Sequence, residues 1–187
     1  MNISSIGGML TNPNVLTASR IAATPVIVVL LMLPSNRVTA FLAALVFSAA
    51  AITDYFDGFL ARKYGQVSNL GKAMDPLADK FLVSAAFIML AAAGRVPGWV
   101  ACIIVIREIG ITGLRNVMVG AGQDISASRL GKFKTGFQIA AIIPLLLHYP
   151  YFGIDLHLLG TWLLWVAVVL TVWSGADYVI KARPFLQ

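Results

Sequence analysis

Four aspartates form two evenly spaced pairs, and they are the residues of this sequence best suited to chemistry. Asp54 and Asp57 lie three residues apart, and Asp75 and Asp79 lie four residues apart. On a helix, either spacing places both carboxylates on one face. Two neighbouring helices in a hairpin could therefore direct all four carboxylates to a single point.

Carboxylates gathered in a poorly hydrated place require a compensating cation, because like charges raise one another's pKa. Hard oxygen ligands suit Mg²⁺ or Mn²⁺, which also bind substrate phosphates and keep coordination positions open for them. Two such ions could stabilise an in-line displacement at phosphorus. Arg62 adds a planar set of donors for a phosphate. The pattern predicts a site for Mg²⁺ or Mn²⁺, with two ions, that is suited to phosphoryl transfer.

Each acid also has an ordinary structural interpretation. Asp75 precedes Pro76 and could cap the amino end of a helix whose first residue is proline. Asp79 could be an interfacial charge, and Gly58 and Ala61 could merely let helices approach closely. These interpretations do not explain why an acid pair recurs on two successive helices, whereas a metal site does.

The composition indicates that a lipid bilayer surrounds the helices that position these residues. Of the 187 residues, 59% are hydrophobic and 12% are charged, and the mean hydropathy is +0.84. A soluble domain carries about 25% charged residues, and one membrane span needs roughly 20 apolar residues. Polar, Pro and Gly residues separate six apolar stretches, at about 15–33, 38–60, 75–93, 99–119, 133–147 and 158–180.

Only helices and closed barrels satisfy their backbone groups within lipid, and barrel strands are only about 10 residues long. We therefore expect an all-α integral membrane protein with six transmembrane helices, forming a single domain over residues 1–187. The first residues lack a basic segment and a cleavage site. The first span should accordingly remain as an anchor instead of being removed as a signal peptide.

Basic residues are distributed unequally between the two sides of the membrane. Of the 14 Lys and Arg residues, only Arg37 and Arg95 fall in the loops at 34–37, 94–98 and 148–157. The other 12 fall in the opposite loops, at the ends of spans that face those loops, or inside the fourth span. The side of those opposite loops should be cytoplasmic by the positive-inside rule. We expect a multi-pass protein of the cell (inner or plasma) membrane, with both termini and the acid pairs on the cytoplasmic side. The scattered net charge of +6 argues against nucleic acid as a partner.

The acid pairs belong to a longer pattern, D-x-x-D-G-x-x-A-R followed by G-x-x-x-D-x-x-x-D. The sequence holds all eight fixed residues: Asp54, Asp57, Gly58, Ala61, Arg62, Gly71, Asp75 and Asp79. This pattern resembles the signature of the CDP-alcohol phosphatidyltransferase family. The resemblance implies a homodimeric membrane enzyme that transfers a phosphatidyl group from a CDP-linked lipid to an alcohol and releases CMP.

The same resemblance implies roles for individual residues. Asp54, Asp57 and Asp75 would bind a pair of metal ions. Asp79 would contact one metal and act as the base toward the acceptor hydroxyl. The residues expected to contact the CDP-lipid are Asn14, Thr17, Gly58, Ala61, Arg62, Ser68 and Gly71.

The fourth expected span carries charge inside the bilayer. Arg107 lies about ten residues, or roughly 15 Å, beyond Pro97, and an intramembrane arginine is a functional hypothesis by default. The alternative is an ion pair of Glu108 with Arg107 or Arg115 inside the span. Adjacent residues diverge around a helix, so we do not expect Arg107 and Glu108 to neutralise each other directly.

A basic pocket is expected where Arg107 and Arg115 approach Lys132 and Lys134. Positive-inside bias alone would explain some of these charges. Together, however, they suit an acceptor alcohol that itself carries a phosphate.

Two sequence blocks resemble the branch of the family that uses sn-glycerol 3-phosphate as acceptor. They are R-E-x-x-x-T-G-L-R at 107–115 and L-G-K-x-K-T-x-x-Q at 130–138. The resemblance implies that CDP-diacylglycerol and glycerol 3-phosphate give phosphatidylglycerophosphate and CMP, a step of phospholipid biosynthesis. Inositol phosphate remains an alternative acceptor, because it also carries a phosphate.

An alternative of another class is a divalent-cation transporter that uses the aspartates as an ion site. A permeation route needs polar residues through the outer half of the membrane as well. The outer halves of the second and third expected spans read VTAFLAALVF and AFIMLAAA. Neither stretch offers such a route.

Overall fold

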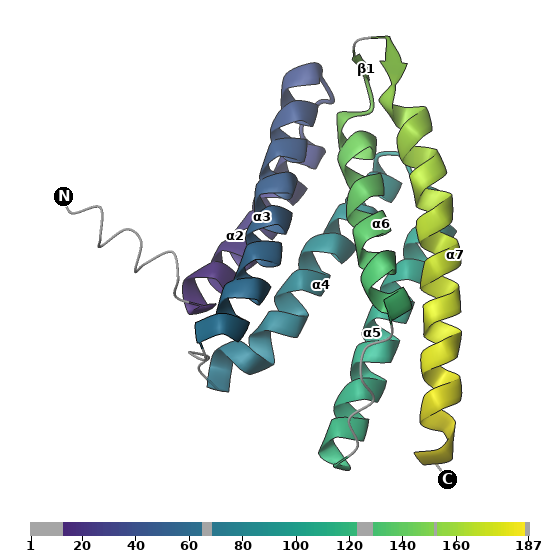
Figure 1. Cartoon of the computed structure of the whole chain (residues 1–187). Helices are drawn as coiled ribbons and strands as arrows, with labels where there is room; N and C mark the ends of the chain where they lie inside the picture. The colour runs from purple at the N-terminus through teal and green to yellow at the C-terminus, as the bar shows by residue number, and fades with distance from the viewer. Residues whose placement is uncertain (1–12, 65–68, 123–128, 152, 186–187) are drawn as a thin grey trace, which may run out of the picture. The chain divides into compact units, whose positions relative to one another are not determined.

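The computed structural model describes residues 13–64, 69–122, 129–151 and 153–185, of which 13–20, 54–64, 69–79, 129 and 185 are described by their backbone alone. The described chain is almost entirely helical, which confirms the all-α expectation. Its helices are α2 (Pro13–Met32), α3 (Arg37–Tyr64), α4 (Asn69–Ala92), α5 (Gly98–Gly120), α6 (Arg129–Leu147) and α7 (Leu156–Ala182) (Figure 1). A two-residue hairpin, β1 (Pro150–Tyr151) antiparallel to β2 (Ile154–Asp155), precedes α7, and a 3₁₀ turn, η1 (Arg183–Phe185), follows it.

Three helix boundaries differ from the expectation by four residues or more. α6 begins at Arg129 instead of near residue 133, and the other two lie beside the acid pairs. α3 continues to Tyr64 instead of ending near residue 60, and α4 begins at Asn69 instead of at Asp75. The additional residues include alanine, arginine, lysine, leucine and methionine, which form helices well even where the apolar run has ended. Asp75 therefore lies inside α4, and its interpretation as the cap of that helix is wrong.

Two described segments are long and apolar enough to cross a membrane, judged by length and composition: Leu130–Leu147 and Leu156–Ala182. Three shorter apolar helical stretches accompany them, Ile21–Met32, Arg37–Thr53 and Lys80–Ala92. The charges that carry the candidate chemistry interrupt the apolar stretches of α3, α4 and α5.

By its internal contacts the chain divides into two compact units, Met1–Met89 and Leu90–Gln187, and each is described by itself. In the first unit, α2 and α3 pack against each other (Figure 1). Asn36 caps α3, because its Oδ1 accepts hydrogen bonds from the backbone N–H groups of Val38 and Thr39, both at 2.9 Å. The buried face of α3 repeats every three or four residues: Ala40, Ala43, Ala44 and Phe47. Its small alanine side chains let neighbouring helices approach closely.

In the second unit, α6 and α7 form a long antiparallel pair, and α5 packs against α7 (Figure 1). Gly160 of α7 lies at a point where the pair is in tight contact. A Cβ atom at this position would lie 2.7 Å from Cγ and 3.0 Å from the backbone nitrogen of Leu145 on α6. The close approach of the two helices therefore requires glycine here.

Replacing Gly160 by alanine should lower stability, because the added methyl group meets backbone that cannot move aside. We expect a loss of about 1–3 kcal/mol, the usual cost of overpacking, measured as a lower apparent unfolding temperature in detergent. Gly136→Ala on α6 is the matched control, since a Cβ there meets no described atom within 4 Å. A Gly160→Ala variant as stable as the wild type would contradict this packing.

Arg95, which precedes α5, holds the carboxyl end of α6. Its Nη1 donates hydrogen bonds to the carbonyl oxygens of Leu146 and Leu145, at 3.0 and 3.5 Å, where a helix leaves acceptors unpaired. His148 follows with a left-handed φ of 48°. Burial lowers the pKa of His148, and the charges of Arg95 and His157 lower it further. The cation at this helix end is thus Arg95, and the neutral form of His148 is favoured beside it.

The buried faces of α5, α6 and α7 change from apolar to polar along their length. Near the hairpin they carry side chains such as those of Leu145, Leu146 and Leu164. The buried polar or charged side chains of the described residues all belong to this unit: Glu108, Lys134, Gln138, Thr171 and Ser174. A buried polar group is costly unless it has a partner. A functional site in this unit is therefore expected among these buried polar residues.

Candidate active site

The four aspartates lie on the two helices that the sequence predicts for them. Asp54 and Asp57 are within α3, and Asp75 and Asp79 are within α4. The spacings of three and four therefore apply to actual helices, and each pair shares a helical face. The orientation of these four side chains is outside what the structure describes.

The other residues expected at the CDP-lipid are distributed over the same part of the chain. Asn14 and Thr17 lie in α2, Gly58, Ala61 and Arg62 in α3, and Gly71 in α4. Ser68 lies outside the described residues. Every residue expected to contact the CDP-lipid whose backbone is described thus belongs to the first unit, together with the aspartates.

The chemistry of the aspartates fits a hard divalent cation. Four carboxylates supply only oxygen ligands, which Mg²⁺ and Mn²⁺ prefer, and only residues 65–68 separate α3 from α4. Among the described side chains, no group of three or more His, Cys, Asp or Glu residues could hold a metal ion. The described part of the chain therefore offers no competing metal site.

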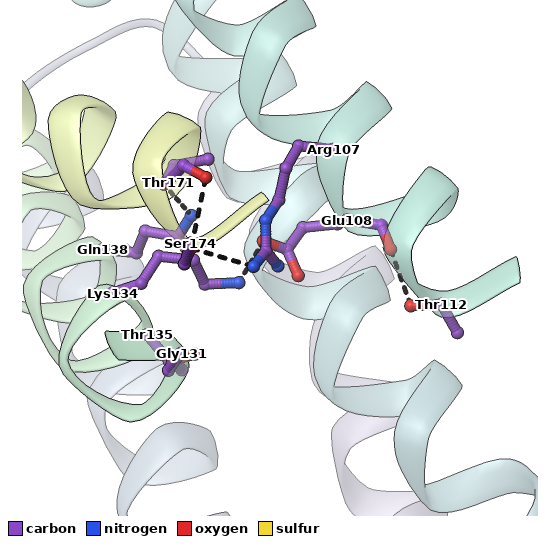
Figure 2. A network of polar contacts seen from close by, with 9 residues as sticks. All are labelled: Arg107, Glu108, Thr112, Gly131, Lys134, Thr135, Gln138, Thr171 and Ser174. Atoms are coloured by element: carbon purple, nitrogen blue, oxygen red, sulfur yellow. Dashed lines mark hydrogen bonds and ion pairs between the residues drawn. The ribbon is translucent and has the colours of Figure 1, made fainter. Parts of the chain in front are cut away.

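A second group of charges is described in full and lies in the other unit. Lys134 of α6 forms an ion pair with Oε1 of Glu108 on α5, and Nη1 of Arg107 lies 3.4 Å from the same oxygen (Figure 2). Glu108 and Lys134 expose only 4% and 3% of their surface. Three charged side chains from two helices thus share one interior site.

The contact between Arg107 and Glu108 corrects the expectation that these neighbours would not pair. Their Cα–Cβ bonds diverge around α5, but both side chains are long, and their charged ends converge (Figure 2). A separation of 3.4 Å is long for a hydrogen bond. Lys134 is therefore the principal partner of Glu108, and Arg107 is the weaker one.

Helix α7 completes the group with hydroxyl side chains. Nη2 of Arg107 donates a hydrogen bond to Oγ of Ser174 at 2.9 Å, and this hydroxyl donates to the carbonyl oxygen of Thr171 at 3.2 Å (Figure 2). Nε2 of Gln138, on α6, donates to Oγ1 of Thr171 at 3.1 Å. We call the connected residues the interior cluster: Arg107, Glu108, Lys134, Gln138, Thr171 and Ser174. Its bonds join α5, α6 and α7, and such connected networks rigidify a core.

Two of the four residues predicted to bind the acceptor phosphate, Arg107 and Lys134, are brought together in the interior cluster. The other two, Arg115 and Lys132, are exposed and lie outside it. Arg115 is eight residues from Arg107 along α5, a rise of about 12 Å. The described side chains therefore form a smaller and more deeply buried basic site than the sequence suggests.

The interior cluster contains two cations and one acid. Arg107 and Lys134 are the cations, and Glu108 is the one acid among its six residues. Nε of Arg107 is buried and has no hydrogen-bond acceptor among the described residues. A buried donor without an acceptor is costly. An anion with several oxygen atoms would accept a hydrogen bond from this donor and interact favourably with both cations.

Sequence reasoning did not single out the contribution of α7. The available signal is the run Thr171-Val-Trp-Ser174-Gly175, which places two hydroxyl groups and a glycine inside an otherwise apolar span. Hydroxyl residues in membrane helices are common enough that this pattern alone indicates no partner. Their link to Arg107 becomes visible only in the folded chain.

Comparison with known proteins places these features in a family. Residues 10–173 match the family described as CDP-alcohol phosphatidyltransferase. A CDP-diacylglycerol–glycerol-3-phosphate 3-phosphatidyltransferase of Bacillus subtilis (strain 168) is 41% identical, with 92% of this chain and 95% of the relative covered. A protein of the same name from Rickettsia typhi is 40% identical, covering 92% and 97%. A probable phosphatidylglycerophosphate synthase of Mycobacterium tuberculosis is 40% identical, covering 90% and 80%.

Proposed function

Because the chain belongs to the CDP-alcohol phosphatidyltransferase family, we propose that it transfers the phosphatidyl group of CDP-diacylglycerol to sn-glycerol 3-phosphate. The products are phosphatidylglycerophosphate and CMP, so the reaction is a step of phospholipid biosynthesis. The observation that carries this proposal is the alignment, over nearly the whole chain, with relatives named for this reaction. The complete eight-residue signature supports it.

In the proposed mechanism the four aspartates bind metal and accept a proton. Asp54, Asp57 and Asp75 would hold the divalent metal on which the family generally depends, and Asp79 would contact it as well. When bound, the metal would supply positive charge to stabilise the pyrophosphate and the departing CMP. Asp79 accepts the proton of the glycerol hydroxyl while that oxygen attacks the lipid-proximal phosphorus. The bond from this phosphorus to the bridging oxygen of CMP breaks on the opposite side.

The residues around the aspartates are proposed to hold the CDP-lipid. Two glycines and an alanine leave space for the ligand, and Arg62 offers paired donors to a phosphate. The remaining members are small polar residues suited to the nucleotide. The full set is Asn14, Thr17, Gly58, Ala61, Arg62, Ser68 and Gly71. Both Mg²⁺ and Mn²⁺ suit the oxygen ligands, and two ions suit four carboxylates.

The interior cluster is proposed to bind the phosphate of the acceptor. Its two cations and the buried Nε of Arg107 support an anionic ligand. Arg107 and Lys134 are the inner contacts of this phosphate, and the exposed Arg115 and Lys132 add charge outside the cluster. A phosphate held in this way orients the glycerol hydroxyl for attack. Free serine or inositol carries no phosphate and would not need this basic pocket.

We further propose that all six described helices span the cell (inner or plasma) membrane as one domain. The unequal distribution of Lys and Arg supports cytoplasmic termini and a cytoplasmic active site. Large apolar side chains are exposed along α5 and α7, for example Ile106, Ile109, Val169 and Trp173. Such surfaces contact lipid or another protein, which supports both membrane embedding and the homodimer expected of the family.

A CMP-release assay with purified protein in lipid–detergent micelles tests the proposal. CDP-diacylglycerol plus glycerol 3-phosphate should give CMP and phosphatidylglycerophosphate, and EDTA should stop the reaction until Mg²⁺ or Mn²⁺ is added. Release with inositol phosphate but none with glycerol 3-phosphate would overturn the choice of acceptor. Metal uptake into proteoliposomes without CMP release would favour the transporter instead.

A further inference from the structure

We propose that Ser174 and Gly175 of α7 are positioning residues that set the orientation of Arg107 toward the phosphate of the acceptor. The inference rests on the proposed function, in which Arg107 binds this phosphate. Both residues lie outside the sequence blocks that carry the resemblance, on a helix with no Asp, Glu, Lys or Arg before Asp177. Gly175 lies against the aliphatic stem of Arg107, and Ser174 accepts a hydrogen bond from its guanidinium.

Gly175 allows the stem of Arg107 to lie directly against the backbone of α7. A Cβ atom at position 175 would lie 3.2 Å from Cγ, 3.5 Å from Nε and 4.0 Å from Cδ of this arginine. These three atoms follow one another along the side chain, so the stem runs across the glycine. An alanine here would displace the stem by a few tenths of an ångström.

Ser174 selects one orientation of the guanidinium. A hydroxyl group has a single proton, and Ser174 donates it to the carbonyl oxygen of Thr171 at 3.2 Å. The lone pairs of Oγ are then available to Nη2 of Arg107, at 2.9 Å. Ser174 is only 1% exposed, so solvent does not compete for this bond. Hydrogen bonds to a charged group are among the stronger ones in proteins.

An arginine held at its stem and at its tip loses little further freedom when it binds a ligand. Binding energy is then not spent on ordering a flexible side chain, and this preorganisation raises affinity. Nη1 faces Glu108 and Nη2 faces Ser174, whereas the buried Nε has no acceptor among the described residues. Loss of the positioning contacts should therefore weaken acceptor binding and leave the CDP-lipid site unaffected.

Steady-state kinetics with each substrate varied in turn test this prediction. Ser174→Ala should raise KM for glycerol 3-phosphate about tenfold, the equivalent of a weakened charge-assisted hydrogen bond. Gly175→Ala should raise this KM about fivefold. A misplacement of 1 Å can cost about 100-fold, and the displacement expected here is only a few tenths of an ångström. KM for CDP-diacylglycerol should not change in either variant. Ser174→Cys replaces the hydroxyl by a somewhat larger thiol that accepts hydrogen bonds poorly, so it should also raise KM for glycerol 3-phosphate.

Two substitutions serve as matched controls. Thr161→Val removes a hydroxyl of α7 that donates to the carbonyl oxygen of His157 in its own helix, at 2.8 Å. Gly136→Ala adds a methyl group where no described atom lies within 4 Å. Both controls should retain the wild-type KM for both substrates. Unfolding temperatures in detergent, measured for every variant, separate lost packing from lost positioning.

Arg107→Met distinguishes failure of this inference from failure of the proposed function. On its own it should raise KM for glycerol 3-phosphate more than either α7 variant. In the Arg107→Met background, Ser174→Ala and Gly175→Ala should cause no further rise, because both act through the arginine. An unchanged KM in Arg107→Met would refute the acceptor site itself. Two results would refute only the positioning role, provided that Arg107→Met itself raises KM for glycerol 3-phosphate. One is a wild-type KM in Ser174→Ala and Gly175→Ala. The other is a further rise in the double variants, equal to the rise that each α7 substitution causes alone.

Discussion

Replacement of Asp79 by asparagine is expected to stop CMP release while leaving the protein folded. Asparagine has nearly the same shape, but its amide cannot accept the proton and it lacks the charge that a metal ligand supplies. Removal of a general base alone costs about 100- to 10,000-fold in rate, and a weakened metal site adds to this loss. We therefore expect a fall of about a thousandfold or more, measured as steady-state CMP release with saturating glycerol 3-phosphate.

Asp177→Asn is the matched control for this substitution. Asp177 also lies on a helix, but it is paired with Lys181 one turn further on, at 2.7 Å, outside the interior cluster. Exposed pairs of this spacing contribute only about 0.3–0.5 kcal/mol, so the control should keep its activity and its unfolding temperature. Full activity of the Asp79→Asn variant would refute the assignment of Asp79 as the base.

The second large effect is expected at Glu108, the one acid of the interior cluster. Glutamine has nearly the same shape but no charge, so Glu108→Gln leaves Lys134 and Arg107 without a counter-charge inside the cluster. Removing one partner of a buried ion pair costs about 3–5 kcal/mol. We expect a sharp fall in the unfolding temperature in detergent, and a parallel loss of activity. A variant as stable as the wild type would show that this ion pair contributes nothing to stability.

A second substitution in the same background separates stability from function. Lys134→Met removes one cation, and a hydrophobic replacement of a buried ion pair is often as stable as the pair itself. The Glu108→Gln, Lys134→Met double variant should therefore recover most of the unfolding temperature. Its KM for glycerol 3-phosphate should stay high, because the proposed phosphate contact of Lys134 is missing. A wild-type KM in the double variant would exclude Lys134 from the acceptor site.

The helices were predictable because their cause is local. Apolar runs punctuated by Pro, Gly and polar residues located each helix, and the all-α class followed from the need to satisfy backbone groups in lipid. The boundaries were less predictable at α3 and α4, where helix-forming polar residues extend the helix beyond its apolar part. Hydropathy marks where an apolar stretch ends, and helix propensity decides where the helix itself ends.

The two candidate sites differ in how far a sequence can predict them. The acid pairs are defined by spacings of three and four residues, which become a shared face as soon as a helix forms. The partners of Glu108 could not be inferred in this way. Local geometry suggested that Arg107 would point elsewhere, yet the flexible ends of the two side chains converge. Lys134 was predicted to hold a phosphate, but its ion pair with Glu108 was not predicted.

The sequence by itself determined the chemistry: paired carboxylates on two helices, the family signature and the lipid environment. The lipid environment follows from composition, and each acid pair lies within about one helical turn. The signature is a pattern of residue types at fixed spacings, which can be found without knowing the fold. Only the tertiary structure decided how the basic residues are held, because those contacts join Glu108 to Lys134 across 26 residues and Arg107 to Ser174 across 67. Contacts at such separations depend on how α5, α6 and α7 pack. For this reason the serine and glycine of α7, unremarkable in the sequence, become the residues that position Arg107.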